Sequence, residues 1–190
     1  MKYRESGMPP EDLWDTFFTP AEILEKLGVD EKINTLVDVG CGYGTFLIPA
    51  AELVGGKVIG IDIDDDMIKA CKDKIQDYNV PFVELIYGDI MTDETMNFLS
   101  DYIGKIDYIS LFNILHCEEP LLLLKKGYEI LNDKGKIGVI HWKSEETPRG
   151  PSIEIRPKPE MIIHWALQAG FTLEQQLELP PYHFGLVFKK

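Results

Sequence analysis

A heptapeptide, DVGCGYG at residues 38–44, carries the strongest local signal in this sequence. It follows the short run TLV at residues 35–37 and precedes an amphipathic stretch, so it is predicted to join a buried strand to a helix. Glycine at positions 40, 42 and 44 lets the backbone turn tightly and approach a ligand without interference from a Cβ atom. The free N–H groups at the start of the next helix favour a polar or anionic group there.

Outward from this loop, short β-branched runs alternate with longer amphipathic stretches. This alternation predicts parallel strands joined by right-handed crossovers, with helices on both faces of one sheet. The double proline at residues 180–181 predicts a closing hairpin, which places one antiparallel strand in the sheet. The predicted strands are residues 35–39, 57–61, 82–86, 106–112, 136–142, 171–179 and 183–188, and the predicted helices are residues 44–53, 64–78, 92–102, 118–131 and 159–169.

The N-terminal region is predicted to be helical. In the segment TPAEILEKLG at residues 19–28, Thr19 is a candidate N-cap and Glu22 completes a capping box. We expect residues 1–30 to form a helical cover on a single domain of 190 residues. The irregular stretch at residues 143–157 is long enough to act as a lid.

Acidic residues follow the second and third predicted strands. Asp62 lies 18 residues beyond Gly44, a spacing that brings a carboxylate beside the glycine loop, where it can accept hydrogen bonds from ribose hydroxyls. The alternative is that Asp62 only caps the next helix, although Asp64 already suits that position. After the third strand, Asp89 can accept a hydrogen bond from an adenine amino group, unless it is simply a turn residue. Three such features after three successive strands favour a nucleoside-containing ligand.

A nicotinamide dinucleotide is one candidate ligand, and its fingerprint is G-x-G-x-x-G. The third glycine of that pattern would fall at Thr45, which argues against it. The observed pattern, G-x-G-x-G preceded by the acid Asp38, resembles motif I of class I S-adenosylmethionine-dependent methyltransferases. The turn at residues 131–136 and the segment at residues 112–116 extend the resemblance, which is greatest to the small type-11, ubiquinone/menaquinone-biosynthesis-like group.

The resemblance implies a Rossmann-like α/β fold: a doubly wound sheet of seven strands in the order 3-2-1-4-5-7-6, with strand seven antiparallel and helices on both faces. It also implies S-adenosyl-L-methionine as the cofactor. The glycine loop would hold the methionine part, Asp62 the ribose, and Ile63 and the 89–90 pair the adenine, while Asn113 would lie near the transferring methyl. The implied cofactor-binding residues are Asp38, Gly40, Gly42, Tyr43, Gly44, Asp62, Ile63, Asp89, Ile90 and Asn113.

Composition narrows the range of partners. The net charge is −13, from 32 acidic and 19 basic residues, so no basic face for nucleic acid is expected. No apolar run reaches the roughly 18 residues of a membrane span, and the N-terminus lacks the apolar core of a secretion signal, which predicts a cytoplasmic protein without a membrane partner. Cys41, Cys71 and Cys117 are odd in number and form no CxxC pair, so reduced thiols are expected. The chain is predicted to be a monomer or a homodimer.

Three histidines fall at predicted strand ends on the acceptor side: His116, His141 and His183. Because strands five and seven are adjacent in the implied order, His141 and His183 are predicted to be neighbours that orient the acceptor or act as a general base. The alternative is that they are three polar residues at the solvent-exposed edge of a sheet. No histidine or cysteine spacing supports a metal site, and none is predicted.

The function predicted is a methyltransferase that acts on a small-molecule acceptor, whose identity the motifs do not specify. A cofactor-binding protein without catalysis is the first alternative. A nicotinamide-dependent oxidoreductase is the second, disfavoured by Thr45 and by the lack of a recognisable hydride-transfer set.

Overall fold

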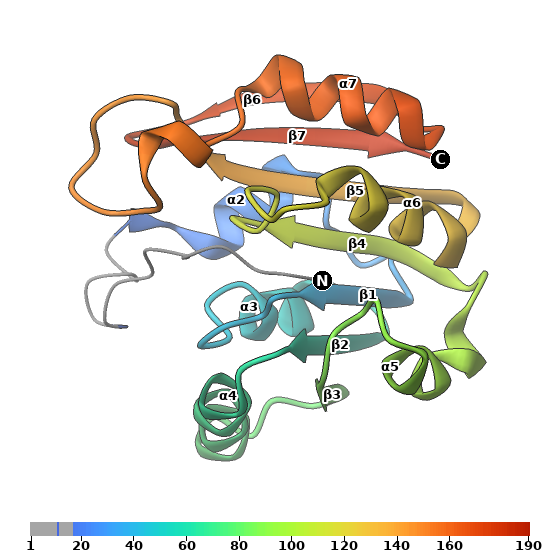
Figure 1. The fold of residues 1–190 in the computed structure, drawn as a ribbon. Coiled ribbons are helices and arrows are strands. Elements are labelled where there is room, and N and C mark those ends of the chain that lie inside the picture. The colour runs from blue at the N-terminus through green and yellow to red at the C-terminus, as the bar shows by residue number, and fades with distance from the viewer. Residues whose placement is uncertain (1–10, 12–16) are drawn as a thin grey trace.

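The computed structural model describes residue 11 and residues 17–190, and its centre is one seven-stranded sheet (Figure 1). The strand order is β3-β2-β1-β4-β5-β7-β6, as the resemblance implies. Strand β7 is antiparallel to both of its neighbours, and the other pairings are parallel. The strands are β1 (Thr35–Val39), β2 (Lys57–Asp62), β3 (Val83–Tyr87), β4 (Ile106–Phe112), β5 (Leu131–Trp142), β6 (Thr172–Leu179) and β7 (His183–Lys189).

Helices cover both faces of the sheet, as the alternating pattern predicts. One apolar cluster joins a face of the sheet to α5 (Asp93–Phe98), α6 (Pro120–Ile130) and α7 (Pro159–Ala169). A second cluster joins the other face to α2 (Pro20–Lys26), α3 (Leu47–Leu53) and α4 (Asp65–Asp77). Short 3-10 turns lie at Ser100–Tyr102 and Ile153–Ile155.

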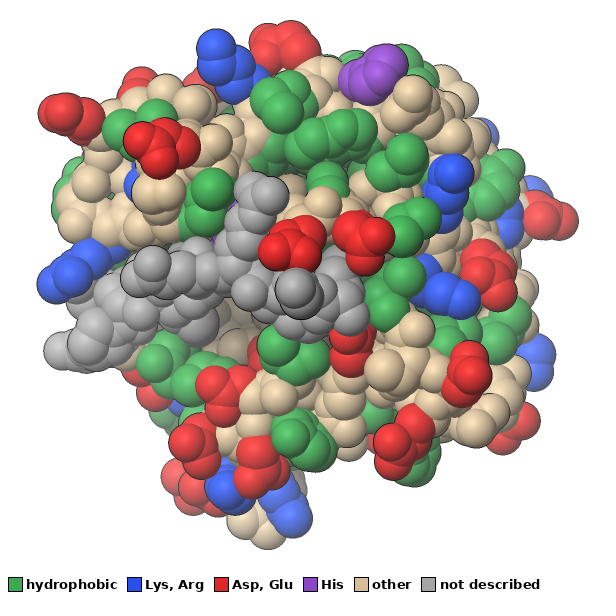
Figure 2. All heavy atoms as spheres, viewed as in Figure 1, with side chains coloured by type: hydrophobic (Ala, Val, Ile, Leu, Met, Phe, Trp, Pro, Cys, Tyr) green, Lys and Arg blue, Asp and Glu red, His purple; other side chains and the backbone are tan. Residues whose placement is uncertain are grey.

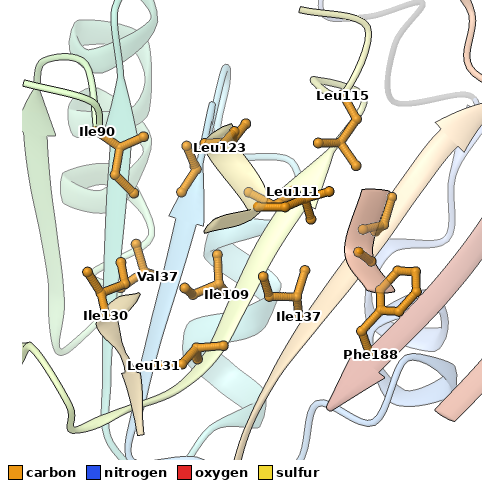
Figure 3. Close-up of a cluster of buried hydrophobic side chains, with 14 of the residues drawn as sticks. Val37, Ile90, Ile109, Leu111, Leu115, Leu123, Ile130, Leu131, Ile137 and Phe188 are labelled. Atoms are coloured by element: carbon orange, nitrogen blue, oxygen red, sulfur yellow. The ribbon is translucent and has the colours of Figure 1, made fainter. Parts of the chain in front are cut away.

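Burial along each strand follows its place in the sheet. Strands β1, β4 and β7 are buried almost throughout, because helices or neighbouring strands cover them on all sides. Strands β3 and β6 form the two edges; β6 is largely exposed, and β3 is mostly half-buried. Figure 3 shows the first apolar cluster, in which Ile109 and Leu111 of β4 lie between β1 and β5 and face Leu123 of α6.

The glycine loop is longer than the sequence predicts. Helix α3 begins at Leu47, not at residue 44, because Gly44 has a φ of +81° and cannot belong to a right-handed helix. The predicted capping box at the start of α2 is wrong: the Thr19 hydroxyl donates to the Glu22 carboxylate at 3.3 Å and caps no backbone N–H. The cap predicted at Asp64 is present, since its carboxylate accepts from the N–H of Asp66.

Strand β5 begins five residues earlier than the predicted start at Lys136. Leu131 pairs with Ile106 of β4, and the next pairing is Lys136 with Tyr108, so the residues between them bulge from the ladder. Within this bulge the side chain of Asn132 accepts from the N–H of Lys134 at 2.9 Å. The turn that resembles the family pattern is therefore a bulge within the strand.

Half of the predicted N-terminal cover, residues 1–10 and 12–16, lies outside the described residues. Its described end packs against the second apolar cluster. The Phe18 ring lies 5.1 Å from that of Phe46, and the Phe17 ring lies 5.7 Å from that of Trp142, measured between centroids. Within the described part of the chain, no helix has the length and hydropathy needed to cross a bilayer.

Acidic side chains are spread over the face of the molecule shown in Figure 2, and the lysines and arginines on that face are scattered among them. This distribution agrees with the net charge of −13. No continuous basic patch is visible on this face of the described chain.

Candidate active site

A cavity of about 410 Å³ opens at the edge of the sheet where the parallel strands end. This is where a doubly wound sheet places its ligands. Residues from the ends of β1, β2, β4 and β5 and from the loop after β3 line it. The predicted site residues among them are Asp38, Gly40, Gly42, Tyr43, Asp62, Ile63, Ile90, Asn113 and His116, whereas Gly44, Asp89, His141 and His183 lie outside the lining.

The glycine loop forms one wall of the cavity. Gly40 has a φ of +76°, and a Cβ atom built there would lie 2.9 Å from Cγ2 of Ile114. Its N–H donates to the carbonyl of Ile61 at 2.7 Å, which ties the start of the loop to the end of β2. The loop backbone is therefore fixed in a conformation that favours glycine.

Asp62 joins the loop to the next strand. Its Oδ2 accepts from the N–H of Gly42 at 2.8 Å, and its Oδ1 accepts from the N–H of Asp64 at 2.9 Å. Burial raises its pKa, and these backbone hydrogen bonds oppose that rise. Because each carboxylate oxygen has a second lone pair, Asp62 can still accept hydrogen bonds from a ligand in the cavity.

Asp38 lies at the floor of the cavity, beside β4. Burial raises its pKa to about 7, while the hydrogen bond from Ser110 lowers it and the negative charge of Asp62 raises it further. A carboxyl group in this state carries a partial charge near neutral pH. A cationic group in the cavity would favour its ionised form.

Asn113 is the clearest sign of a missing polar partner in the cavity. It follows β4 with a φ of +57°, an uncommon conformation for a residue other than glycine. Both polar atoms of its amide are buried, and neither has a hydrogen-bond partner among the described residues. Since buried amides are normally paired, this one is poised to bind a polar group that enters the cavity.

The segments that follow β2 and β3 contribute apolar side chains to the cavity. Ile90 is buried and Ile63 is exposed, and both line the cavity. The side chain of Asp89 accepts from the N–H of Met91 at 2.8 Å, within the turn that leads to α5. The turn role that the sequence left open for Asp89 is thus present in the structure.

Aromatic rings form another part of the cavity wall. Phe46, Phe112 and Trp142 all line the cavity, and the centroids of Phe46 and Phe112 lie 4.9 Å apart in an edge-to-face arrangement. This part of the wall is apolar. Phe46 is the N-cap residue of α3, Phe112 is the last residue of β4, and Trp142 is the last residue of β5. It suits a flat or apolar molecule next to the cofactor position.

The predicted pairing of His141 with His183 is wrong. In the antiparallel ladder His183 pairs with Trp142, whereas His141 pairs with Phe184. Since neighbouring residues of a strand point to opposite faces, the two histidine side chains lie on opposite faces of the sheet. His183 packs against the rings of Trp142 and Phe18, and its buried Nε2 has no hydrogen-bond partner within residues 11 and 17–190.

The histidine that meets His141 is His116. Nδ1 of His116 lies 3.4 Å from Nε2 of His141, and both side chains are buried. His116 lines the cavity directly, and His141 lies behind it, against the ring of Phe184. Among the described residues, no group of three or more histidine, cysteine or acidic side chains is placed to hold a metal ion.

Sequence reasoning missed Arg156, which organises the loop at residues 143–157. Its guanidinium donates to four backbone carbonyls, at distances from 2.7 to 3.1 Å, and lies 5.4 Å from the ring of Trp142. Trp142 in turn lines the cavity. The four carbonyls belong to Lys143, Glu145, Arg149 and Pro151.

Comparison of the sequence with known protein families identifies the family to which the chain belongs. Residues 30–169 match a family model described as a methyltransferase domain, which is well over half of the chain. The chain belongs to this methyltransferase family. Its cofactor is S-adenosylmethionine, as in the solved relatives that share the fold.

Three similar proteins illustrate the relationship. The chain is 31% identical over 107 residues to a demethylmenaquinone methyltransferase of Oceanobacillus iheyensis, covering 55% of the chain and 42% of that protein. It is 27% identical over 130 residues to one from Listeria welshimeri, covering 67% of the chain and 52% of that protein. A crystal structure of a SAM-dependent methyltransferase from Aquifex aeolicus is 25% identical, with a TM-score of 0.82 and coverage of 95% of this chain and 93% of that one. The methyltransferase chain thus spans about half the length of these two curated relatives.

The cavity fits the cofactor of this family. The unpartnered amide of Asn113 offers hydrogen bonds, and the glycine loop leaves a cradle that a Cβ at Gly40 could occupy only by displacing Ile114. Asp38 and Asp62 bring negative charge to a site for a molecule that carries a sulfonium and an ammonium group.

Proposed function

We propose that this methyltransferase transfers the methyl group of S-adenosylmethionine to a small, largely apolar, ring-containing acceptor. One observation carries the proposal: a single cavity runs from the glycine loop and Asp62 to the aromatic wall. The first part offers polar groups for the cofactor. The aromatic wall offers flat apolar surface for an acceptor, with His116 at its margin.

The cofactor end is assigned residue by residue. The backbone of residues 40–44 would hold the methionine part, next to Asp38. Asp62 would accept hydrogen bonds from the ribose hydroxyls, and Ile63 and Ile90 would enclose the adenine. The Asn113 amide, buried and unpartnered, would contact the cofactor near the sulfonium. The cofactor, when bound, supplies an electrophilic methyl group.

The acceptor class follows from the aromatic wall and from the relatives. Phe46, Phe112 and Trp142 exclude water and provide ring surface for stacking. The curated relatives act, by their names, on demethylmenaquinone, whose ring system has this chemistry. A reduced quinone or another phenol-like ring is therefore the acceptor class that the site suits best. Residues 143–157, anchored at Arg156, would cover the acceptor side.

The chain's own contribution to catalysis would be mainly positioning. Transfer requires the acceptor atom to approach the methyl carbon in line with the bond that breaks, so holding both molecules in one cavity would supply much of the rate. The apolar wall also removes water from the acceptor, which strengthens the electrostatic interactions there.

The test is turnover with a labelled methyl donor. Reduced demethylmenaquinone, simple phenols, aliphatic amines and a DNA duplex are each offered at equal concentration. We expect label in the quinol or phenol products, and little in the amines or the duplex. Calorimetry should also show that S-adenosylhomocysteine binds and NAD does not. Methylation of the amines alone, or tight binding of NAD, would contradict the proposal.

A further inference from the structure

Helix α4 packs against the glycine loop through two side chains that lie one turn apart, Cys71 and Lys74. A Cβ atom at Gly44 would lie 2.6 Å from Sγ of Cys71, so the helix and the loop are in close contact. Nζ of Lys74 donates a hydrogen bond to the carbonyl oxygen of Tyr43 at 3.0 Å. Tyr43 lines the cavity and Lys74 does not, so α4 supports the cavity wall from outside the lining.

The hydrogen bond from Lys74 acts on a part of the loop that β2 does not hold. The N–H groups of residues 40–42 donate to the carbonyl and carboxylate oxygens at the end of β2. The peptide unit between Tyr43 and Gly44 is held differently. Its N–H donates to the carbonyl of Cys41 within the loop at 3.0 Å, and its oxygen accepts from Lys74. Lys74 therefore supplies an external contact that orients this peptide unit.

The same ammonium group forms an ion pair with the carboxylate of Glu11. Glu11 belongs to the N-terminal region, residues 1–30, which the sequence predicts to be a cover. An ammonium group has three N–H donors, so it can bind a carbonyl and a carboxylate at the same time. Lys74 thus joins residue 11, α4 and the glycine loop.

This ion pair is shielded from water more than the others on α4. The side chains of Lys74 and Glu11 are 24% and 34% exposed, whereas those of Lys69 and Asp65 are 63% and 54% exposed. Burial lowers the pKa of Lys74, because the ammonium group loses hydration there. Its two protein acceptors replace part of that hydration. Without the Glu11 carboxylate, the ammonium group would gain hydration by turning toward water, and the Tyr43 carbonyl would lose its donor.

We propose that Lys74 is a positioning residue for the cofactor, and that its ion pair with Glu11 couples the N-terminal region to cofactor binding. Lys74 acts by orienting the Tyr43 peptide unit, and not by touching the cofactor. The inference rests on the proposed function, because it needs the glycine loop to hold the methionine part of the cofactor. Such coupling is reciprocal, so the Glu11 contact strengthens cofactor binding and bound cofactor strengthens the Glu11 contact.

Calorimetry with S-adenosylhomocysteine measures the effect of Lys74. Lys74→Met keeps the helix propensity and should weaken binding by about five-fold or more, the lower end of typical coupling between two sites. Lys74→Arg still offers donors to the carbonyl and the carboxylate, and should keep most of the affinity. The control is Lys69→Met, which removes ion pairs that stay within α4 and should bind like the wild type. Wild-type affinity in a folded Lys74→Met protein would overturn the proposal.

A double-mutant cycle tests the coupling to Glu11. Glu11→Gln keeps the shape of the side chain and removes its charge, and it should weaken S-adenosylhomocysteine binding by about two- to five-fold, the range for one ion pair near the surface. In the Lys74→Met background the same substitution should have no further effect. Lys74→Gln takes the place of Lys74→Met in the cycle if circular dichroism shows that Lys74→Met is unfolded. Wild-type affinity in Glu11→Gln, or an equal loss in both backgrounds, would overturn the coupling.

Kinetics separate positioning of the cofactor from a general structural role. With a ring acceptor that the wild type methylates, Lys74→Met should raise the KM for S-adenosylmethionine and leave kcat at saturating cofactor nearly unchanged. A lower kcat with an unchanged KM would contradict the proposal. A wild-type chain that binds S-adenosylhomocysteine but methylates none of the offered rings contradicts the proposed function, while calorimetry still decides the role of Lys74. An active wild type whose Lys74→Met and Glu11→Gln variants keep full affinity overturns the inference and leaves the proposed function intact.

Discussion

The hydroxyl of Ser110 donates a 2.5 Å hydrogen bond to Oδ1 of Asp38, and the two residues are paired in the ladder between β1 and β4. Both side chains are buried. Burial raises the pKa of Asp38 from 3.8 to about 7, although the Ser110 hydrogen bond opposes this rise. The floor of the cavity therefore carries a carboxyl group that changes its charge near neutral pH.

The Asp38→Asn variant should reveal this titration. Between pH 3.8 and about 7 the folded chain keeps a proton on Asp38 that the unfolded chain has lost. The Asp38 contribution to the free energy of unfolding therefore falls as pH rises through this window, by up to about 1.4 kcal/mol per pH unit. Denaturant unfolding from pH 4 to 8 should show the wild-type curve falling relative to Asp38→Asn. The exposed residue Asp77 gives the control, Asp77→Asn, and parallel curves for Asp38→Asn and wild type would refute the shift.

Asp62→Ala should weaken S-adenosylhomocysteine binding by roughly a hundred- to ten-thousand-fold. Two hydrogen bonds from the ribose to a charged acceptor are at stake, each worth roughly 1.5–3 kcal/mol. Part of the loss in affinity would come from the glycine loop, because Asp62 also accepts a hydrogen bond from the N–H of Gly42 in that loop. Calorimetry measures the affinity, and circular dichroism checks that the variant is folded. Wild-type affinity in a folded variant would remove Asp62 from the ribose site.

Gly44→Ala and Gly28→Ala form a matched pair. Their φ angles are +81° and +79°, so both variants bear the strain of about 1–2 kcal/mol that a side chain meets there. A Cβ at Gly44 would lie 2.6 Å from Sγ of Cys71, whereas a Cβ at Gly28 meets nothing within 4 Å. Chemical unfolding should therefore show a larger loss for Gly44→Ala. Adding Cys71→Ala should recover part of the difference, and equal losses in the two single variants would contradict the contact.

Arg156→Lys should loosen the loop at residues 143–157. An ammonium group cannot reach four carbonyls at once, as the planar guanidinium does. We expect faster backbone hydrogen exchange in this loop and little change in the strands. The control is Arg149→Lys at an exposed position of the same loop, which should speed hydrogen exchange less than Arg156→Lys does. Unchanged exchange in Arg156→Lys would show that other contacts hold the loop.

His183→Phe should stabilise the chain in acid relative to wild type. Burial, and then the charges of Arg156 and Lys143, lower the pKa of His183 from 6.5 to about 3. Between these values the unfolded chain binds a proton that the folded chain does not, so wild-type stability is lost as pH falls below 6.5. The phenyl ring can pack against Phe18 and Trp142 without this penalty. Unfolding curves at pH 7 and pH 5 measure the change, with His164→Phe as the control, and an equal difference at both values would count against it.

Much of the fold could be predicted because its signals are local. Buried parallel strands appear as short apolar runs, and the positions of their ends place the glycine loop, Asp62 and Ile90 at one edge of the sheet. The predicted bounds of β4 and α7 agree with the structure. The edges of α3 and β5 do not, because a positive φ at Gly44 and a bulge after Leu131 are decided by contacts beyond the local pattern.

The histidines show where sequence reasoning ends. Strand order alone makes His141 and His183 neighbours, but the register pairs His183 with Trp142, and a shift of one residue moves a side chain to the other face. The partner of His141 comes instead from the loop after β4. Arg156 left no pattern at all, because its partners are main-chain carbonyls, which every residue possesses.

The way Arg156 holds its loop bears on how this scaffold can be redesigned. The guanidinium recognises only main-chain oxygens, so Ser144, Glu146 and Pro148 take no part in that anchorage. Gly150 is different, because a Cβ there would lie 2.8 Å from the Trp142 ring. A library of variants at Ser144, Glu146 and Pro148 that keeps Arg156 and Gly150 would introduce new side chains beside the aromatic wall without changing the loop backbone.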